Sequence, residues 1–511
     1  MWIFPTLEMD GGELNQNQAI TNSIEGTWII QWGSTFNTYN KAFCHWYCPT
    51  TWYNLCIMKS LVAKTLLTYL RLLAKLQLKK NKKAKLIGVT GSSGKSTTHT
   101  AIYAVLKDYF QVKKSQKANS ESGIPLDILG LHPESYTKLE WLKLALMAPI
   151  KLLTNWKRFD IYLVEMGIDG PDEPKNMRYL LKILQPDIGV FTGVTTSHSE
   201  PWDKLIFTNN LDHASRVDKL KKLIATEKGL MLRRLPGDGW AIYNADDPFV
   251  VEAVKPSKAH QLKVGTHDQA DIKIIKATTG QKSLTIKLKH QDNEASFIIH
   301  QPFLAEKLAI DFALAVGVGV ALGLSLKQAG QSLSKNFKPL SGRGRILKGI
   351  RQSTIIDASY NAQPDAVLAN LALLKQLKTN GRKLVVLGDM RELGQSSRYW
   401  HEKIADEAAK IADEIVLVGP MMKEFFLPQA IKRGFDKNKI HHFGNTYQAS
   451  LFVKKQVKPS DLILVQASQN TLLFEIIVKE ILSDEEDPDE VLARWRSTYF
   501  KRERKKIIDE N

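Results

Sequence analysis

A short segment rich in glycine and serine carries the clearest chemistry of this sequence. Residues 90–97 follow an apolar strand pattern and precede a helical one. Glycines let successive backbone N–H groups converge on a phosphate, a lysine neutralises its β and γ oxygens, and a following serine can ligate Mg²⁺ at a helix N-terminus. The segment predicts an ATP-binding phosphate loop made of Thr90, Gly91, Ser92, Ser93, Gly94, Lys95, Ser96 and Thr97.

Short apolar strands alternate with helical segments from Lys85 onward, which is typical of parallel sheets covered on both faces. We therefore predict an α/β protein, with a P-loop parallel-sheet central ATPase domain followed by a Rossmann-like α/β C-terminal domain. The expected strands are Lys85–Thr90, Asp160–Met166, Ile188–Thr192 and Trp240–Asn244, then Thr354–Ala358, Lys383–Gly388, Glu414–Val418 and Asp461–Gln466.

Changes in composition divide the chain into five segments. Leucines recur at helical spacing after Met58, among lysines, and we expect the natural chain to start at this methionine. The predicted segments are 1–57, a non-native or disordered extension; 58–84, a basic amphipathic helix; 85–338, the central ATP-binding domain; 339–482, the C-terminal domain; and 483–511, a charged tail forming a solvated helix or a frayed end.

The formal charge of +18 would attract nucleic acid, anionic lipid or a polyanionic small substrate. The basic residues are scattered and lack interleaved aromatic side chains, so we expect no nucleic-acid partner. The helix over residues 59–79 either packs on the next domain or contacts a membrane surface peripherally. The 3 cysteines all lie before Met58 and no secretory signal is evident, which favours a cytoplasmic protein.

The phosphate loop is a shortened one, because Val89 stands where the general pattern has glycine. This form, opened by Thr-Gly, resembles the Mur ligases, and further motifs follow in that family's order. Resembling segments are Lys117-Ala118-Asn119 of the substrate loop, Glu165-Met166-Gly167 of the metal site, the loop around His198, the segment around Lys228, whose lysine is carbamylated in the family, and Asn244-Ala245-Asp246-Asp247 beside the nucleoside.

The resemblance extends through a Gly342-Arg343 hinge to two long motifs, Asp357–Pro364 and Gly388–Gly394, with His401 beyond. These motifs resemble the branch that adds D-alanyl-D-alanine to UDP-MurNAc-tripeptide, which implies a monomeric enzyme with ATP and Mg²⁺ and an acyl-phosphate intermediate. The implied roles are catalysis for Lys95, Lys228, His198 and Arg343; ATP binding also for Asn244, Asp247 and Arg343; metal binding for Ser96, Glu165, His198 and Lys228; and substrate binding for Asn119, Asp357, Tyr360, Asn361 and Ser468.

Three departures from the family concern the substrates. The segment before Lys85 has no evident counterpart of the domain that grips the UDP-sugar. Glu306-Lys307-Leu308 replaces a His-Asn pair near the adenine, and Gln466-Ala467-Ser468 replaces a Lys-Gly-Ser stretch that meets the dipeptide. Loss of a cation where a carboxylate docks removes a charge-assisted hydrogen bond of about 1.5–3 kcal/mol.

Three other functions remain open from the sequence. One is another amino-acid ligase of the same superfamily, of the folylpolyglutamate type, against which the two C-terminal motifs argue. A second is a P-loop ATPase acting on nucleic acid, suggested by the positive charge. The third is a non-catalytic binding protein, against which Lys95, Glu165, His198 and Lys228 argue.

Overall fold

The structure is a computed structural model with two compact units, Met1–Thr65 and Leu66–Asn511. In the first unit, β1 (Ser23–Ile24) pairs antiparallel with β2 (Thr27–Trp28). Helix α2 (Thr50–Leu78) begins in the first unit and ends in the second. The described residues are 23–24, 27–28, 50–116, 118–134, 137–196, 199–206, 212–280, 283–301, 306–468 and 472–509, and they include no helix long and apolar enough to cross a membrane.

A 9-stranded sheet forms the first half of the second unit, in the order β11-β10-β9-β8-β7-β6-β3-β5-β4. The strands from β4 to β9 are parallel, and β10 and β11 extend the sheet as antiparallel strands. The strands are β3 (Lys85–Thr90), β4 (Val112–Lys114), β5 (Ile161–Glu165), β6 (Ile188–Phe191), β7 (Trp240–Asn244), β8 (His260–Gly265), β9 (Ile272–Thr279), β10 (Leu284–His290) and β11 (Asn293–Ile299).

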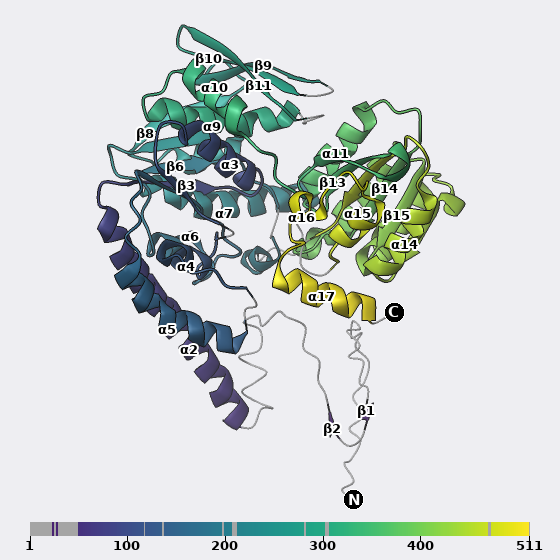
Figure 1. Ribbon diagram of the computed structural model, residues 1–511, viewed down its shortest axis with the longest axis horizontal. Coiled ribbons are helices and arrows are strands. Elements are labelled where there is room, and N and C mark those ends of the chain that lie inside the picture. The colour runs from purple at the N-terminus through teal and green to yellow at the C-terminus, as the bar shows by residue number, and fades with distance from the viewer. Residues whose placement is uncertain are drawn as a thin grey trace, which may run out of the picture. The chain divides into compact units, whose positions relative to one another are not determined.

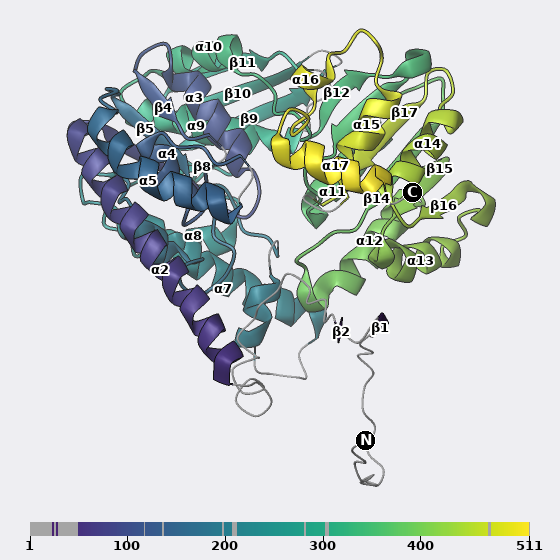
Figure 2. The same cartoon turned by 60° about the horizontal axis from the view of Figure 1, so that its bottom comes forward.

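Helices cover both faces of this sheet, as Figures 1 and 2 show. Side chains of α3, α9 and α10 form one apolar core with the strands, and side chains of α4, α6, α7 and α8 form the core on the other face. The helices are α3 (Lys95–Leu106), α4 (Gly123–Leu129), α6 (Met177–Leu181), α7 (His213–Arg233), α8 (Pro248–Val254), α9 (Ala309–Ala321) and α10 (Leu326–Asn336).

Two further helices, α2 and α5 (Lys138–Thr154), make an outer layer against α4. Leu70 of α2, Leu144 and Ala148 of α5, and Leu126 and Leu129 of α4 bury their side chains in one cluster. The residues of α2 from Leu66 onward therefore pack on the domain.

A 6-stranded sheet follows, in the order β12-β13-β17-β14-β15-β16, parallel except for the edge strand β12. Helices α11, α12 and α13 cover one face, and α14 and α15 cover the other. The elements are β12 (Arg345–Lys348), β13 (Thr354–Ala358), α11 (Pro364–Gln376), β14 (Lys383–Gly388), α12 (Ser397–Ala408), β15 (Glu414–Val418), α13 (Leu427–Lys432), β16 (Ile440–Phe443), α14 (Thr446–Gln456), β17 (Leu462–Gln466) and α15 (Glu475–Ile481).

The two predicted α/β halves are thus confirmed. The tail, predicted as a solvated helix or a frayed end, forms a helix with one buried side chain. Helices α16 (Pro488–Val491) and α17 (Thr498–Asp509) close the described chain. Phe500 is fully buried against Leu473 and Ile476. Burial of an aromatic side chain of this size anchors a segment that its charges alone would leave solvated.

Candidate functional site

The phosphate loop lies between β3 and α3, as its residues predict. Gly91 and Gly94 have positive φ angles of 145° and 80°, which favour glycine. A Cβ on Gly91 would lie 2.0 Å from Thr192 Oγ1, and one on Gly94 would lie 2.3 Å from Asp311 Oδ1. The loop is therefore closely backed by β6 and by α9, and only glycine fits at both positions.

Lys95 opens α3 and turns back over the loop. Its Nζ donates hydrogen bonds to Gly91 O at 2.8 Å and Ser92 O at 3.2 Å. Burial lowers the pKa of Lys95, the charge of Glu165 opposes that shift, and the charge of Arg343 adds to it. An ammonium held at the loop by backbone carbonyls is positioned to meet phosphate oxygens.

Ser96 and Glu165 meet beside this lysine. Ser96 Oγ donates to Glu165 Oε2 at 3.1 Å, and Glu165 is the last residue of β5. Oxygen donors of this kind suit Mg²⁺. Among the described residues, no group of three or more His, Cys, Asp or Glu side chains is arranged to hold a metal ion.

His99 supports this pair, although the sequence did not single it out. Its Nδ1 lies 3.8 Å from Glu165 Oε1, and its Nε2 lies 3.2 Å from Leu163 O. Burial lowers the pKa of His99. The spacing of three residues from Ser96 places both side chains on one face of α3, and this was the signal available in the sequence.

Lys228 comes to the same region from α7 and is 4% exposed. Burial is the largest cause that lowers the pKa of Lys228 well below its ordinary value, and the charge of Lys95 lowers it further. Asp169 and Glu227 oppose both effects. Asp169, four residues beyond the end of β5, also raises the pKa of Lys95 and is a second site residue that sequence reasoning missed.

Asn119, in the loop between β4 and α4, lies beside the turn that follows β5. Its carbonyl accepts a hydrogen bond from Gly167 N at 2.9 Å. A Cβ on Gly167 would lie 3.2 Å from the same oxygen, so the two segments approach closely. The predicted metal ligand His198 lies outside the described residues.

Asn244 and Asp247 hold the neighbouring strand ends together. Asn244 Nδ2 donates to Thr192 O at 3.0 Å, and Asp247 Oδ2 accepts from Val194 N at 2.7 Å. Asp247 Oδ1 also accepts from Phe249 N at 3.0 Å and so caps α8. Both residues predicted to contact ATP thus also support the backbone at the edge of the loop.

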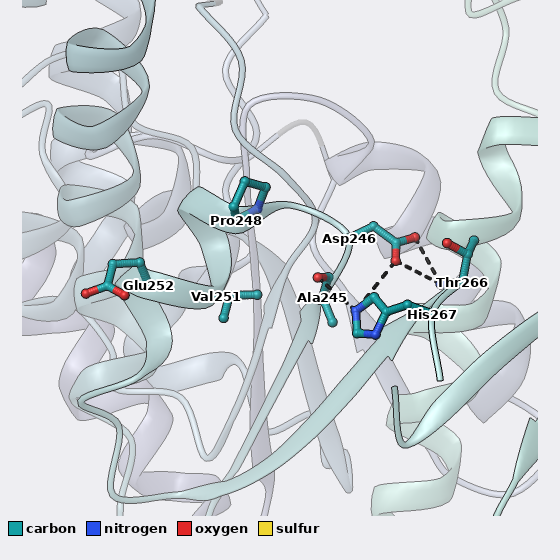
Figure 3. A pocket seen from close by; sticks show the side chains of 7 residues that line it. All are labelled: Ala245, Asp246, Pro248, Val251, Glu252, Thr266 and His267. Atoms are coloured by element: carbon teal, nitrogen blue, oxygen red, sulfur yellow. Dashed lines mark hydrogen bonds and ion pairs between the residues drawn. The ribbon is translucent and has the colours of Figure 1, made fainter. Parts of the chain in front are cut away.

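A cavity of about 520 Å³ opens beside this segment, and Figure 3 shows its lining. Asp246 accepts a hydrogen bond from Thr266 N at 2.8 Å, and its Oδ1 lies 3.8 Å from His267 Nε2. None of the phosphate-loop residues lines the cavity, so it is separate from the phosphate chemistry. Its lining residues are Ala245, Asp246, Pro248, Val251, Glu252, Thr266 and His267.

Arg343 and Asp357 both lie at the start of the C-terminal domain. The Arg343 guanidinium lies 4.7 Å from the centroid of the Tyr360 ring. Asp357 is fully buried and accepts from Gly342 N and Ser359 N, both at 3.1 Å. Burial raises the pKa of Asp357 to about 6. Its carboxylate therefore holds the Gly342-Arg343 turn in place.

The last predicted substrate residues also make internal contacts. The Asn361 carbonyl accepts from Gln466 Nε2 at 3.2 Å. Ser468 Oγ accepts from Arg391 N at 2.9 Å and donates to Ala362 O at 3.3 Å. The two C-terminal motifs and the segment after β17 are thus tied into one loop cluster.

His401 fixes the second motif. Its Nε2 accepts from Met390 N at 3.1 Å, so its Nδ1 carries the proton and donates to Ser397 O at 2.8 Å. Burial lowers the pKa of His401. A neutral imidazole with both nitrogens occupied acts as a support for the loop.

A P-loop domain with lysine, serine and glutamate at its loop, followed by a second parallel α/β domain, defines a class of two-domain nucleotide-binding proteins. Residues 89–319 match the Mur ligase middle domain. Residues 342–469 match the domain described as Mur ligase, glutamate ligase domain. The chain belongs to the Mur ligase family.

Individual proteins are similar to the chain in sequence or in fold. A UDP-N-acetylmuramoyl-tripeptide--D-alanyl-D-alanine ligase of Bacillus subtilis is 28% identical over 394 residues, which cover 77% of this chain and 75% of the relative. The crystal structure of Thermotoga maritima MurF ligase in complex with ADP aligns with a TM-score of 0.62 at 22% identity, over 81% of this chain and 83% of that one. Acinetobacter baumannii MurF aligns with a TM-score of 0.63 at 21% identity, over 81% and 80%.

Proposed function

We propose that this Mur ligase is an ATP-dependent amide ligase of peptidoglycan precursor synthesis that adds D-alanyl-D-alanine to UDP-MurNAc-tripeptide. The observation that carries the proposal is the assembly of Lys95, Ser96, Glu165 and Lys228 around one phosphate loop. The curated relatives named for this reaction support the choice of substrates. Membership of the family and the phosphate loop support ATP as the nucleotide.

The reaction needs activation of a carboxylate, which is a poor electrophile. One carboxylate oxygen of the tripeptide forms a bond to the γ-phosphorus of ATP while the bond to the bridging oxygen breaks, giving an acyl phosphate and ADP. The amine of the dipeptide then attacks the acyl carbon, releases phosphate and loses a proton. Lys95 stabilises the negative charge on the transferring phosphoryl group.

Ser96 and Glu165 are the described residues that would hold Mg²⁺, and we propose His198 and Lys228 as further ligands. A bound Mg²⁺ would supply positive charge beside the phosphates. His99 and Asp169 belong to the surrounding shell, because His99 Nδ1 lies 3.8 Å from Glu165 Oε1 and the charge of Asp169 acts on Lys228.

Lys228 is suited to carbamylation by its surroundings. The neutral form of an amine attacks CO₂, forming an N–C bond and releasing a proton, so a lowered pKa favours the reaction. The pKa of Lys228 is well below its ordinary value because of burial and the nearby charge of Lys95. The ammonium of Lys228, the second cation at the site beside Lys95, would then be replaced by a negatively charged carbamate.

Substrate contacts complete the proposal. Asn119 would meet the sugar-peptide near Glu165, and Asp357, Tyr360, Asn361 and Ser468 would shape the dipeptide side. Arg343 acts on the pKa of Lys95, which supports a role at the γ-phosphate. Closure of the C-terminal domain would exclude water from the acyl phosphate.

Phosphate release from ATP tests the proposal, measured with UDP-MurNAc-tripeptide, with D-alanyl-D-alanine, with both and with neither. We expect release to require both substrates and to stop when either is omitted. Release stimulated by DNA or RNA would replace the ligase by a nucleic-acid ATPase, and release with folate and glutamate would replace it by a ligase of the folylpolyglutamate type. No release under any condition would indicate a binding protein.

The proposal includes a cytoplasmic, monomeric enzyme. The nucleotide-linked substrate, and 3 cysteines that all lie before Met58, support the location, and the resemblance to the family supports the monomer. It also includes peripheral contact of the helix over residues 59–79 with a membrane surface. The basic residues and leucines of that helix support this contact.

A further inference from the structure

Helix α5 carries an apolar stripe on its outer face. Leu139, Leu142, Leu146, Ile150 and Leu153 follow at spacings of three or four residues, so they share one side of the helix. Their side chains are 77%, 57%, 65%, 50% and 73% exposed. Single exposed leucines are ordinary, but five on one face form a contiguous apolar surface that favours a partner.

The opposite side of α5 already makes the contacts that hold the helix on the domain. Leu144 and Ala148 are 7% and 0% exposed, and they pack with Leu70 and Leu126. The stripe is therefore a second apolar face, separate from the one that the fold uses.

Helix α2 widens this face. Tyr69 Oη donates to Ala145 O at 3.1 Å and Lys80 Nζ to Asn155 O at 3.3 Å, so α2 and α5 lie side by side, as Figures 1 and 2 show. Leu72 lies three residues beyond Tyr69 along α2 and is 55% exposed. Leu76 follows one turn later and is 48% exposed. Both leucines thus add exposed apolar surface on the helix beside α5.

The charges around the stripe are almost all positive. Within residues 66–83 and 138–158, Glu140 is the only acidic residue. Trp156 is 61% exposed at the end of α5, with Lys80 Nζ 4.1 Å from its ring centroid. Tryptophan at the end of an apolar face with basic neighbours is typical of a lipid interface. The basic residues are Arg71, Lys75, Lys79, Lys80, Lys82, Lys83, Lys138, Lys143, Lys151, Lys157 and Arg158.

We propose that the stripe of α5, together with Leu72 and Leu76, docks on an anionic lipid surface. The apolar side chains enter the boundary between headgroups and acyl chains, and the basic residues contact the headgroups. A second copy of this chain is a poorer occupant, because a symmetric pair would bring these same basic residues together. The inference extends the membrane contact proposed for residues 59–79 to α5 and does not depend on the ligase reaction.

Sedimentation of the full chain with vesicles tests this surface. We expect binding to vesicles of phosphatidylcholine with phosphatidylglycerol, weaker binding to phosphatidylcholine alone, and loss of binding as salt screens the charges. The triple variant Leu142→Gln, Leu146→Gln, Ile150→Gln should bind at least about tenfold more weakly, because its apolar face is lost. Phosphate release measured on the same samples reports the ligase reaction independently.

A matched control replaces three exposed apolar residues outside α2 and α5. Ile298, Ile431 and Leu451 are 40%, 44% and 41% exposed, and the triple change of each to Gln should leave vesicle binding as in the unchanged chain. Equal unfolding temperatures of the two triple variants would show that both fold. Equal vesicle binding by the two, or no binding by the unchanged chain, overturns the proposal. So does a concentration-dependent dimer in lipid-free solution that the α5 variant loses.

Discussion

Ser96 and Ser468 lie in two regions that match Mur ligase domains, and the structure uses them differently. Ser96 donates to the carboxylate of Glu165, a side chain suited to metal binding, and Lys95 and Lys228 come to the same place. Ser468 accepts a backbone N–H and donates to a backbone carbonyl. The side chains of Ser96 and Glu165 face each other at the phosphate loop, whereas the hydroxyl of Ser468 bonds to backbone groups.

We infer that the residues at the phosphate loop take part in the reaction, whereas the C-terminal residues stabilise loops. Asp357 and His401 resemble Ser468, since each uses its polar atoms to hold a loop. We therefore expect changes at the phosphate loop to reduce turnover with little loss of stability. Changes in the C-terminal cluster should reduce stability first.

Lys95→Ala should have the largest effect. Loss of its charge at the transferring phosphoryl group should reduce phosphate release by about 10³-fold, with little change in the unfolding temperature. Lys107→Ala, at the exposed C-terminal end of the same helix, is the matched control and should keep normal turnover. Comparable turnover in both variants would remove Lys95 from the chemistry.

Lys228→Ala should follow, with a loss of about 10²-fold that added bicarbonate does not restore. The exposed Lys222 of the same helix supplies the control, Lys222→Ala. Mass spectrometry of the intact chain under CO₂ should show the carbamate adduct in the control and its absence in Lys228→Ala. An adduct of equal amount in both variants would assign the carbamate elsewhere.

Asp311→Asn should change how stability depends on pH. Burial raises the pKa of Asp311 to about 7, whereas the unfolded carboxyl ionises near 3.8. The stability that the protonated group contributes is present below about pH 4 and is lost as the pH rises through about 7. Denaturant unfolding measures the free energy of unfolding at pH 4.5 and at pH 8. The decrease of this free energy between the two pH values should be roughly 2–4 kcal/mol smaller in the variant than in the unchanged chain. Parallel pH dependences would contradict this result.

Ser468→Ala and Ser96→Ala test the comparison directly. Ser468→Ala removes the acceptor of the Arg391 N–H, so it should lower the free energy of unfolding by about 1–3 kcal/mol. Ser96→Ala should leave that free energy nearly unchanged and reduce phosphate release. The contrast between the regions would fail if Ser468→Ala abolished turnover at unchanged stability.

Much of the fold was predictable because its signals are local. The strands Lys85–Thr90 and Trp240–Asn244 have the predicted bounds, since each is a short apolar run between turn residues. Strand β9 and the antiparallel strands β10 and β11 were not predicted, although the alternation of apolar and lysine residues in β9 and β10 has the period of a strand. The burial of Phe500 was not predictable, because the buried residues in its cluster, Leu473 and Ile476, lie more than twenty residues away.

The sequence by itself determined the phosphate loop and the order of the matched motifs. The loop is a local feature, because its glycines, lysine and serine stand at fixed spacing within a few consecutive residues. Only the tertiary structure decided which matched residues face the loop. Lys228 joins Lys95 across more than a hundred residues, while Asp357 and Ser468 are occupied by backbone groups. The second apolar face of α5 was also decided there, because burial of one side by α2 and α4 leaves the other exposed.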